Sequence, residues 1–297
     1  MSENNPPLSP KIISRLNNLY LKARFVVEGF IVGLHKSPYH GFSVEFSEHR
    51  TYGYGDEIRH IDWKLWGKTD KYFVKQFEEE TNLKAYLLLD QSSSMHYKSG
   101  DTSKLEYAKM LTASLTYLML KQQDAVGLTL FDNKIRNNIP PRSKKSHINV
   151  ILSQLENISQ GSKTKIAPIL HKIAEVTQKR GLIILISDLF DSQEDVLSSL
   201  QHFRYKGHEV IVFHILDDQE LKLKFNQLTR FLDMETGEEI ITEPWHIQKD
   251  YQKKIQSFCK FYKTQCRKNN IDYILLNTNT PLDIALSEYL IKRKRVG

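Results

Sequence analysis

The sequence predicts an α/β fold: a doubly wound, mainly parallel sheet flanked by helices. From residue 83 onward, short apolar runs alternate with longer segments in which apolar residues recur at helical spacing. This alternation is typical of βαβ units. Two of the apolar runs, at 83–89 and 181–187, have the character of buried strands and are each followed by an acidic residue. Ligands bind at the carboxyl ends of strands in such sheets, so these two positions are candidates for a functional site.

The N-terminal part of the chain has a different character. Apolar residues recur at helical spacing over 9–27, which predicts an amphipathic helix. Residues 38–80 are richer in Gly, Tyr, His and charge, and 73–77 alternates like a half-buried strand. We therefore expect a small N-terminal α+β module over residues 1–80, followed by the α/β domain over residues 81–297.

The α/β domain begins with a strand at 83–89, a helix at 105–120 and a strand at 125–131. Ser103 and Glu106 have the spacing of a capping box at the start of that helix. Further helices are expected at about 144–157, 166–179, 194–204, 244–268 and from Pro281 onward, with strands at 181–187, 209–215 and 271–276. Between them, residues 218–243 are expected to insert a β-hairpin that turns at Thr236 and Gly237.

Composition limits the kind of protein this is. The chain has 297 residues, of which 40% are hydrophobic, enough to bury a core without disulfides. Its two cysteines lie on a predicted helix without metal-binding spacing, which favours a reducing compartment. Neither an export signal nor a membrane span is recognisable, so we expect a cytoplasmic protein. The net charge of +7 favours acidic partners, but the basic runs are typical of solvated helix faces, and no nucleic-acid partner is expected.

Oxygen-bearing side chains gather where the predicted strands end. Asp90, Ser92 and Ser94 follow the first strand, Thr164 precedes the helix at 166–179, and Asp188 follows the strand at 181–187. Mg²⁺ binds oxygen ligands, so these residues are candidates for a metal site. A structural alternative stays open, because Asp and Ser are also common in turns and helix caps.

The order of these residues resembles the metal-ion-dependent adhesion site of von Willebrand factor A domains. In that family an Asp-x-Ser-x-Ser loop, a threonine and a later aspartate surround one Mg²⁺ or Mn²⁺. The implied ligands in this sequence are Asp90, Ser92, Ser94, Thr164 and Asp188. The resemblance implies a site that binds a carboxylate of a partner protein.

A second group of charged, aromatic and glycine residues lies at 50–64. The pattern R-x-Y-x-x-G-D-x-x-R-x-x-D-W is met at Arg50, Tyr52, Gly55, Asp56, Arg59, Asp62 and Trp63. Together with segments at 77–80, 232–237 and 280–282, it resembles the signature of a bacterial family, domain of unknown function fifty-eight. The group is either a partner-binding surface or a cluster of ion pairs and aromatic rings with a structural role.

The resemblance implies a fold like that of von Willebrand factor A domains and an association with MoxR-type AAA+ ATPases. We therefore expect a non-catalytic, Mg²⁺-dependent protein-interaction domain with no catalytic residues, an adaptor for such an ATPase or for an acidic client in the maturation of other proteins. One alternative is a metal-assisted phosphoester hydrolase, which would require a general base near the ion. The other is a scaffold that acts without metal through residues 50–63.

Overall fold

A computed structural model describes residues 18–36, 49–51, 66–67, 72–75, 83–158, 165–225, 227–232 and 238–293. The chain divides into two units: Val32–Asn82, and Met1–Ile31 together with Leu83–Gly297. In the smaller unit, β1 (His49–Thr51) pairs antiparallel with β2 (Phe73–Lys75), the latter within the segment predicted to be a strand. The prediction of a module over 1–80 is not tested further by these few residues.

The larger unit is built on a six-stranded sheet in the order β10-β7-β6-β3-β4-β5. Its strands are β3 (Lys84–Asp90), β4 (Ala125–Phe131), β5 (Ile135–Arg142), β6 (Leu182–Ser187), β7 (Glu209–Leu216) and β10 (Asp272–Asn277). All neighbouring pairs are parallel except β4 with β5. The predicted doubly wound, mainly parallel sheet is therefore confirmed.

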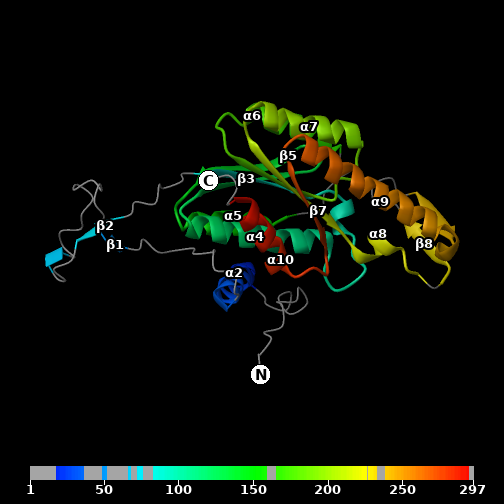
Figure 1. The fold of residues 1–297 in the computed structure, drawn as a ribbon. Coiled ribbons are helices and arrows are strands. Elements are labelled where there is room, and N and C mark those ends of the chain that lie inside the picture. The colour runs from blue at the N-terminus through cyan, green and yellow to red at the C-terminus, as the bar shows by residue number, and fades with distance from the viewer. Residues whose placement is uncertain are drawn as a thin grey trace, which may run out of the picture. The chain divides into compact units, whose positions relative to one another are not determined.

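Helices cover both faces of the sheet (Figure 1). One face carries α6 (Ile166–Val176), α7 (Gln193–Tyr205) and α9 (Pro244–Lys268); the other carries α4 (Lys104–Lys121), α5 (His147–Glu156) and α10 (Leu282–Arg293). All six residues of β6 are buried, because helices pack on both of its sides. The capping box predicted for α4 is present, with Ser103 and Glu106 bonded to each other's backbone N–H.

The chain changes direction across the sheet between β3 and β6. The strand after β3 is β4 on one side, whereas the next parallel strand, β6, pairs with the opposite edge of β3. The helices that follow β3 and β6, namely α4 and α7, lie on opposite faces (Figure 1). This reversal leaves a crevice at the carboxyl ends of the two strands, where open α/β sheets bind ligands. The candidate residues Asp90 and Asp188 stand at this position.

The edge strand β5 was not predicted. Its sequence contains Pro140 and Pro141, which lack the N–H that a central strand needs and are tolerated in an edge strand. The register shifts twice along its pairing with β4. Its backbone passes so close to β4 that a Cβ on Gly127 would lie 2.7 Å from the carbonyl oxygen of Ile139, which explains the glycine.

The inserted segment after β7 forms a short helix and a hairpin. The helix α8 (Asp218–Lys222) was not predicted; β8 (Thr229–Leu232) and β9 (Glu239–Thr242) form the expected antiparallel pair. The N-terminal helix, predicted over 9–27, is described as α2 (Leu19–Lys36) and so runs beyond its predicted end. Among the described helices, none is both long enough and apolar enough to span a membrane.

Candidate functional site

The loop after β3 folds around the carboxylate of Asp90. This residue ends the strand and is fully buried. Its Oδ1 accepts a hydrogen bond from the backbone N–H of Ser92 (2.9 Å), and the hydroxyl oxygens of Ser92 and Ser94 lie 3.0 Å apart. The alternation of Asp and Ser therefore brings one carboxylate and two hydroxyls together, as the sequence predicted.

The end of β6 joins this loop through a residue that the sequence analysis did not single out. The Ser187 hydroxyl donates to Oδ2 of Asp90 at 2.7 Å and also accepts from the N–H of Leu189 at 3.0 Å. Asp188, the next residue, is 1% exposed. Both predicted carboxylates thus lie on the same buried edge, linked by Ser187.

Two buried carboxylates close together repel each other. Burial raises the pKa of Asp90 to about 7, and the charge of Asp188 adds to the shift, against the opposing hydrogen bonds from Ser187 and Ser92. A neighbouring cation would remove this repulsion and favour the ionised form.

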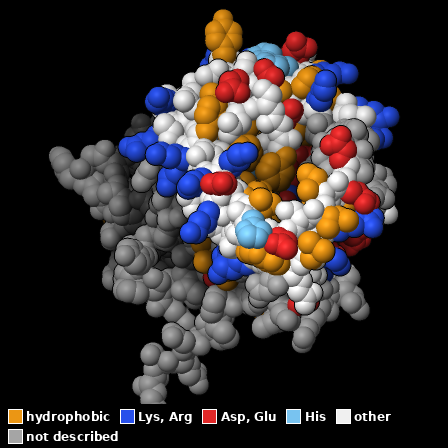
Figure 2. Space-filling view, turned by 90° about the vertical axis from the view of Figure 1, so that its right-hand side faces the viewer, with side chains coloured by type: hydrophobic (Ala, Val, Ile, Leu, Met, Phe, Trp, Pro, Cys, Tyr) orange, Lys and Arg blue, Asp and Glu red, His pale blue; other side chains and the backbone are white. Residues whose placement is uncertain are grey.

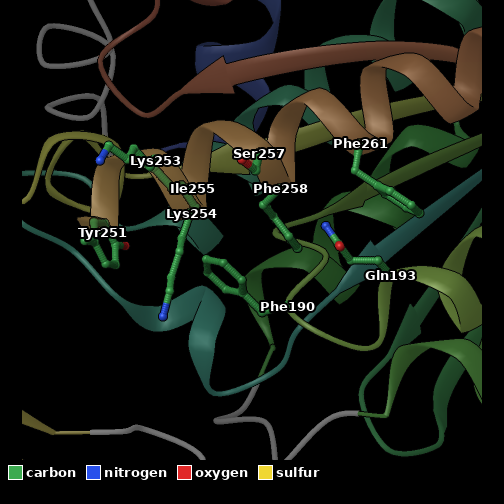
Figure 3. A pocket seen from close by; sticks show the side chains of 9 residues that line it. All are labelled: Phe190, Gln193, Tyr251, Lys253, Lys254, Ile255, Ser257, Phe258 and Phe261. Carbon is green, nitrogen blue, oxygen red and sulfur yellow. The ribbon is translucent and has the colours of Figure 1, made fainter. Parts of the chain in front are cut away.

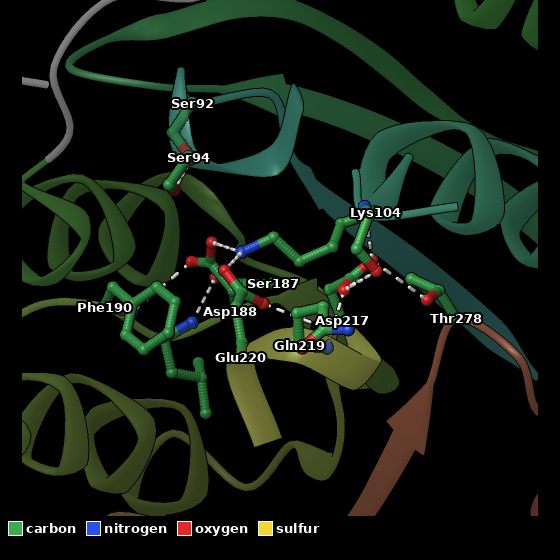
Figure 4. A network of polar contacts seen from close by, with 12 residues as sticks. Ser92, Ser94, Lys104, Ser187, Asp188, Phe190, Asp217, Gln219, Glu220 and Thr278 are labelled. Carbon is green, nitrogen blue, oxygen red and sulfur yellow. Dashed lines mark hydrogen bonds and ion pairs between the residues drawn. The ribbon is translucent and has the colours of Figure 1, made fainter. Parts of the chain in front are cut away.

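Among the described residues, Lys104 brings a cation to this site. The fully buried ammonium of Lys104, on the first residue of α4, lies 2.8 Å from Oδ2 of Asp188 and 2.6 Å from Oε1 of Glu220 (Figure 4). Its Nζ also lies 4.8 Å from the ring centre of Phe190. Burial alone would lower the pKa of Lys104, but Asp188 and Glu220 outweigh this effect and raise it. Burial nevertheless raises the pKa of Glu220, so the ion pair does not fully offset the desolvation of that carboxylate.

The donor set fits a divalent cation. When Asp90, Asp188 and Glu220 are all ionised, the network carries two more negative charges than Lys104 neutralises. The hydroxyls of Ser92 and Ser94 add neutral oxygen donors of the kind that Mg²⁺ binds. Within the described ranges, no cluster of three or more His, Cys, Asp or Glu side chains is arranged to hold a metal, so any ion here would depend on the hydroxyls.

The remaining predicted site residues fall elsewhere. Thr164, the fifth candidate ligand, lies outside the described residues. So do five members of the candidate partner-binding group, Tyr52, Asp56, Arg59, Asp62 and Trp63. Arg50 lies in β1 opposite Val74 of β2. The structure therefore brings together Asp90, Ser92, Ser94 and Asp188 and gives no position for the other candidates beyond that of the Arg50 backbone.

Sequence reasoning missed Lys104, Ser187 and Glu220. A signal existed for Lys104, because a lysine at the first position of a helix opposes the helix dipole, where acidic residues are preferred. Its ion pairs with Asp188 and Glu220 explain why it is tolerated there. Ser187 and Glu220 carried no local signal that set them apart from ordinary strand-end and capping residues.

The six-stranded, mainly parallel sheet with its helices on both faces defines a domain like that of von Willebrand factor A. The family model described as "Protein of unknown function DUF58" matches residues 48–257, and the chain belongs to that family. The resemblance seen in the sequence is thus confirmed for family and fold.

A sequence relative and two solved structures are similar to this chain. An uncharacterized protein of Mycobacterium tuberculosis is 24% identical over 217 residues, which cover 72% of this chain and 68% of that protein. The crystal structure of an aerotolerance-related membrane protein from Bacteroides fragilis is 20% identical, with a TM-score of 0.50, and covers 71% of this chain and 99% of that one. The conserved hypothetical protein BatB from Bacteroides thetaiotaomicron has a TM-score of 0.48 at 18% identity, covering 72% and 99% of the two chains.

Proposed function

We propose that this protein is a non-catalytic, Mg²⁺-dependent protein-interaction domain. The observation that carries the proposal is the buried pair Asp90 and Asp188 at the switch point of the sheet, together with the hydrogen-bonded hydroxyls of Ser92 and Ser94 in the loop after β3. Burying carboxylates together is unfavourable unless cations accompany them, and Lys104 supplies one positive charge for the three carboxylates of Asp90, Asp188 and Glu220. Such an arrangement is costly as a purely structural device and is suited to holding an ion.

In this proposal Asp90, Ser92, Ser94 and Asp188 bind Mg²⁺ or Mn²⁺, together with Thr164, which is included from the family resemblance. When bound, the ion supplies a coordination position that attracts a carboxylate. The protein's own groups prepare the site: Ser187 orients Asp90, and Lys104 holds Asp188 in place. A partner protein that offers Asp or Glu would complete the interaction.

Isothermal titration calorimetry with MgCl₂ tests the metal site. We expect the wild type to bind Mg²⁺ and Asp90→Asn to lose measurable binding, because the substitution keeps the shape of the side chain and removes its charge. Asp217→Asn is the matched control, since Asp217 is also a buried aspartate after a strand, but its carboxylate accepts hydrogen bonds from Ser99 and Gln219 and makes none with Asp90 or Asp188. Equal Mg²⁺ binding by the wild type and Asp90→Asn would overturn the assignment.

From the family resemblance we propose a MoxR-type AAA+ ATPase or its acidic client as the protein bound at this edge, with the chain as adaptor in the maturation or assembly of other proteins. An affinity pull-down in excess MgCl₂ and in EDTA tests both points. Recovery of such an ATPase in Mg²⁺ alone is the expected result, and equal recovery in EDTA would favour a scaffold that acts without metal.

A further inference from the structure

A groove opens beside the candidate site, between α9 and the loop from β6 to α7. Its volume is about 700 Å³, within the range of sites that hold a peptide side chain or a small ligand. It is lined by Phe190, Gln193, Tyr251, Lys253, Lys254, Ile255, Ser257, Phe258 and Phe261 (Figure 3). On the side of the molecule where α8, α9 and β8 lie, hydrophobic side chains surround a hollow, and Lys and Arg side chains gather near it (Figure 2).

Aromatic rings form the apolar wall of the groove. The rings of Phe190 and Phe258 are stacked with their centres 5.6 Å apart. Phe258 in turn packs edge to face against the buried Tyr262, with ring centres 5.2 Å apart. Rings held in this way present a fixed apolar surface to a ligand and lose little conformational entropy when one binds.

Phe190 also belongs to the candidate metal site. Its backbone N–H approaches Oδ1 of Asp188 at 3.4 Å, and its ring covers the ammonium of Lys104. A single residue is therefore a wall of the groove on one side and a neighbour of both charged groups on the other. A ligand that fills the groove lies next to the edge where the proposed function places a partner's carboxylate.

The charge of the lining indicates what kind of ligand fits. None of the nine lining residues is acidic, and two are lysines. The side chain of Lys254 extends toward the end of the groove formed by Tyr251 and Phe190 (Figure 3). An apolar wall with an ammonium at the end formed by Tyr251 and Phe190 complements a ligand that combines an apolar side chain with a carboxylate.

We propose that this groove binds a short segment of a partner protein in which an aromatic or large aliphatic residue neighbours Asp or Glu. The apolar side chain packs against Phe190 and Phe258, and a carboxylate pairs with Lys254. The proposal rests on the proposed function, because it names the chemistry of the partner that the same edge recognises. In this proposal the groove selects the sequence of the partner segment, and the bound ion attracts any accessible carboxylate.

The test selects peptides from a phage-displayed library of random linear sequences on the full-length wild type in excess MgCl₂. Enriched sequences are expected to contain Asp or Glu close to Phe, Trp or Leu. A fluorescein-labelled consensus peptide is then titrated by fluorescence anisotropy. Lys254→Glu should weaken binding at least roughly tenfold. Lys263→Glu, the same change on α9 outside the groove, should leave it within about twofold.

Two further variants keep the result independent of folding. Phe258→Leu retains an apolar side chain and should still weaken binding of the consensus peptide. Tyr205→Ala, on the exposed end of α7, should leave this binding unchanged. Replacing the acidic residue of the peptide by lysine should restore binding to Lys254→Glu. No enriched consensus, or a consensus bound equally by the wild type, Lys254→Glu and Phe258→Leu, would overturn the proposal.

The same titrations separate this proposal from the metal site. Consensus peptide that binds equally in EDTA and to Asp90→Asn, yet is lost in Lys254→Glu, supports the groove and counts against the metal-dependent function. If the phage library yields no consensus, and the protein binds phosphatidylglycerol vesicles with an affinity that Lys254→Glu and Lys263→Glu weaken equally, the basic helix would instead be assigned to a lipid surface. A concentration-dependent dimer broken by Lys254→Glu in light scattering would assign the groove to a second copy. Either outcome overturns the peptide proposal.

Discussion

Buried aspartates follow several strands at the carboxyl edge of the sheet, and two of these regions, around Asp217 and around Asp90 and Asp188, differ in their surroundings. Asp217, after β7, is 1% exposed, yet its carboxylate receives hydrogen bonds from Gln219 and Thr278 (Figure 4) and from Ser99. With Glu220 it forms the capping box of α8. The carboxylate is held by neutral donors from three segments of the chain, and its role in the structure is fully explained by capping and by tying loops together.

Asp90 and Asp188 are buried to the same degree, but the negative charges of their carboxylates are not compensated in the same way. They lie near each other, and the pKa of Asp90 is raised by burial and by this neighbour. The cation at the site, Lys104, is shared with Glu220. Position at a strand end and burial therefore do not distinguish a structural aspartate from a candidate ligand. The balance of charge around the carboxylate does, and the following variants test that distinction.

The largest change in the free energy of unfolding is expected from Lys104→Met. Removing the ammonium leaves the buried Asp188 and the partly buried Glu220 without their counter-charge, which should lower the free energy of unfolding by about 3–5 kcal/mol in the absence of Mg²⁺. Guanidinium chloride unfolding followed by circular dichroism measures the change. The matched control is Lys222→Met, which breaks an ion pair whose lysine is 49% exposed and should change stability by less than about 1 kcal/mol.

The interpretation also predicts that Glu220→Gln relieves part of the damage in the Lys104→Met background. The double variant should be more stable than Lys104→Met alone, because one buried charge without a partner has been removed. Strictly additive losses for the two substitutions would show that Lys104 and Glu220 do not interact in solution.

The next largest effect concerns Asp90→Asn and depends on pH. In EDTA, the raised pKa of Asp90 makes its contribution to the free energy of unfolding depend on pH. This contribution is fully present below the pKa of Asp90 in the unfolded chain, near 3.8, and is lost as pH rises through about 7. The asparagine variant has no such loss. Its stability relative to the wild type should therefore increase between pH 5 and pH 8, by on the order of 2 kcal/mol.

Urea unfolding of both proteins at these two pH values gives the comparison. Excess MgCl₂ should shrink the difference at pH 8 by stabilising the wild type alone. A relative stability that is the same at both pH values would contradict the charge repulsion inferred for Asp90 and Asp188.

Asp217→Ala should have a smaller effect, and one that does not respond to Mg²⁺. It removes the cap of α8 and leaves donors of Ser99 and Gln219 without their acceptor, at a cost of about 1–2 kcal/mol. Urea unfolding with and without MgCl₂ should give the same cost. A larger cost in MgCl₂ would place Asp217 in the ion-binding group and remove the contrast with Asp90.

Most of the fold could be predicted because its signals are local. The helix at 244–268 was predicted with its observed bounds, since proline at its start and a long run of helical spacing mark it clearly. The strand at 125–131 also has its predicted bounds. The edge strand β5 was missed because Pro140 and Pro141 argue against a strand, and only pairing with β4 makes one.

In the candidate site, too, the contacts within one loop were predictable and the contacts between distant segments were not. Asp90, Ser92 and Ser94 lie in one loop, so their spacing alone predicted that they meet. Lys104 reaches Asp188 across 84 residues of sequence, because α4 packs on the sheet beside β3. Such a contact has no local signal, and a buried lysine is uncommon enough that composition gives no hint of it. Sequence therefore predicted the oxygen donors and missed the charge that accompanies them.

The smallest effect is expected from Thr278→Val, which sharpens the description of Asp217. The hydroxyl of Thr278 lies 3.4 Å from Oδ2 of Asp217, at the long end of the hydrogen-bond range, and valine has nearly the same shape. Asp217 keeps its bonds from Ser99 and Gln219. Loss of stability should therefore stay under about 0.5 kcal/mol in urea unfolding, whereas Ser99→Ala should cost about 1 kcal/mol. A cost for Thr278→Val as large as that of Asp217→Ala would mean that Asp217 depends on a single donor, and its carboxylate would then be as poorly balanced as that of Asp90.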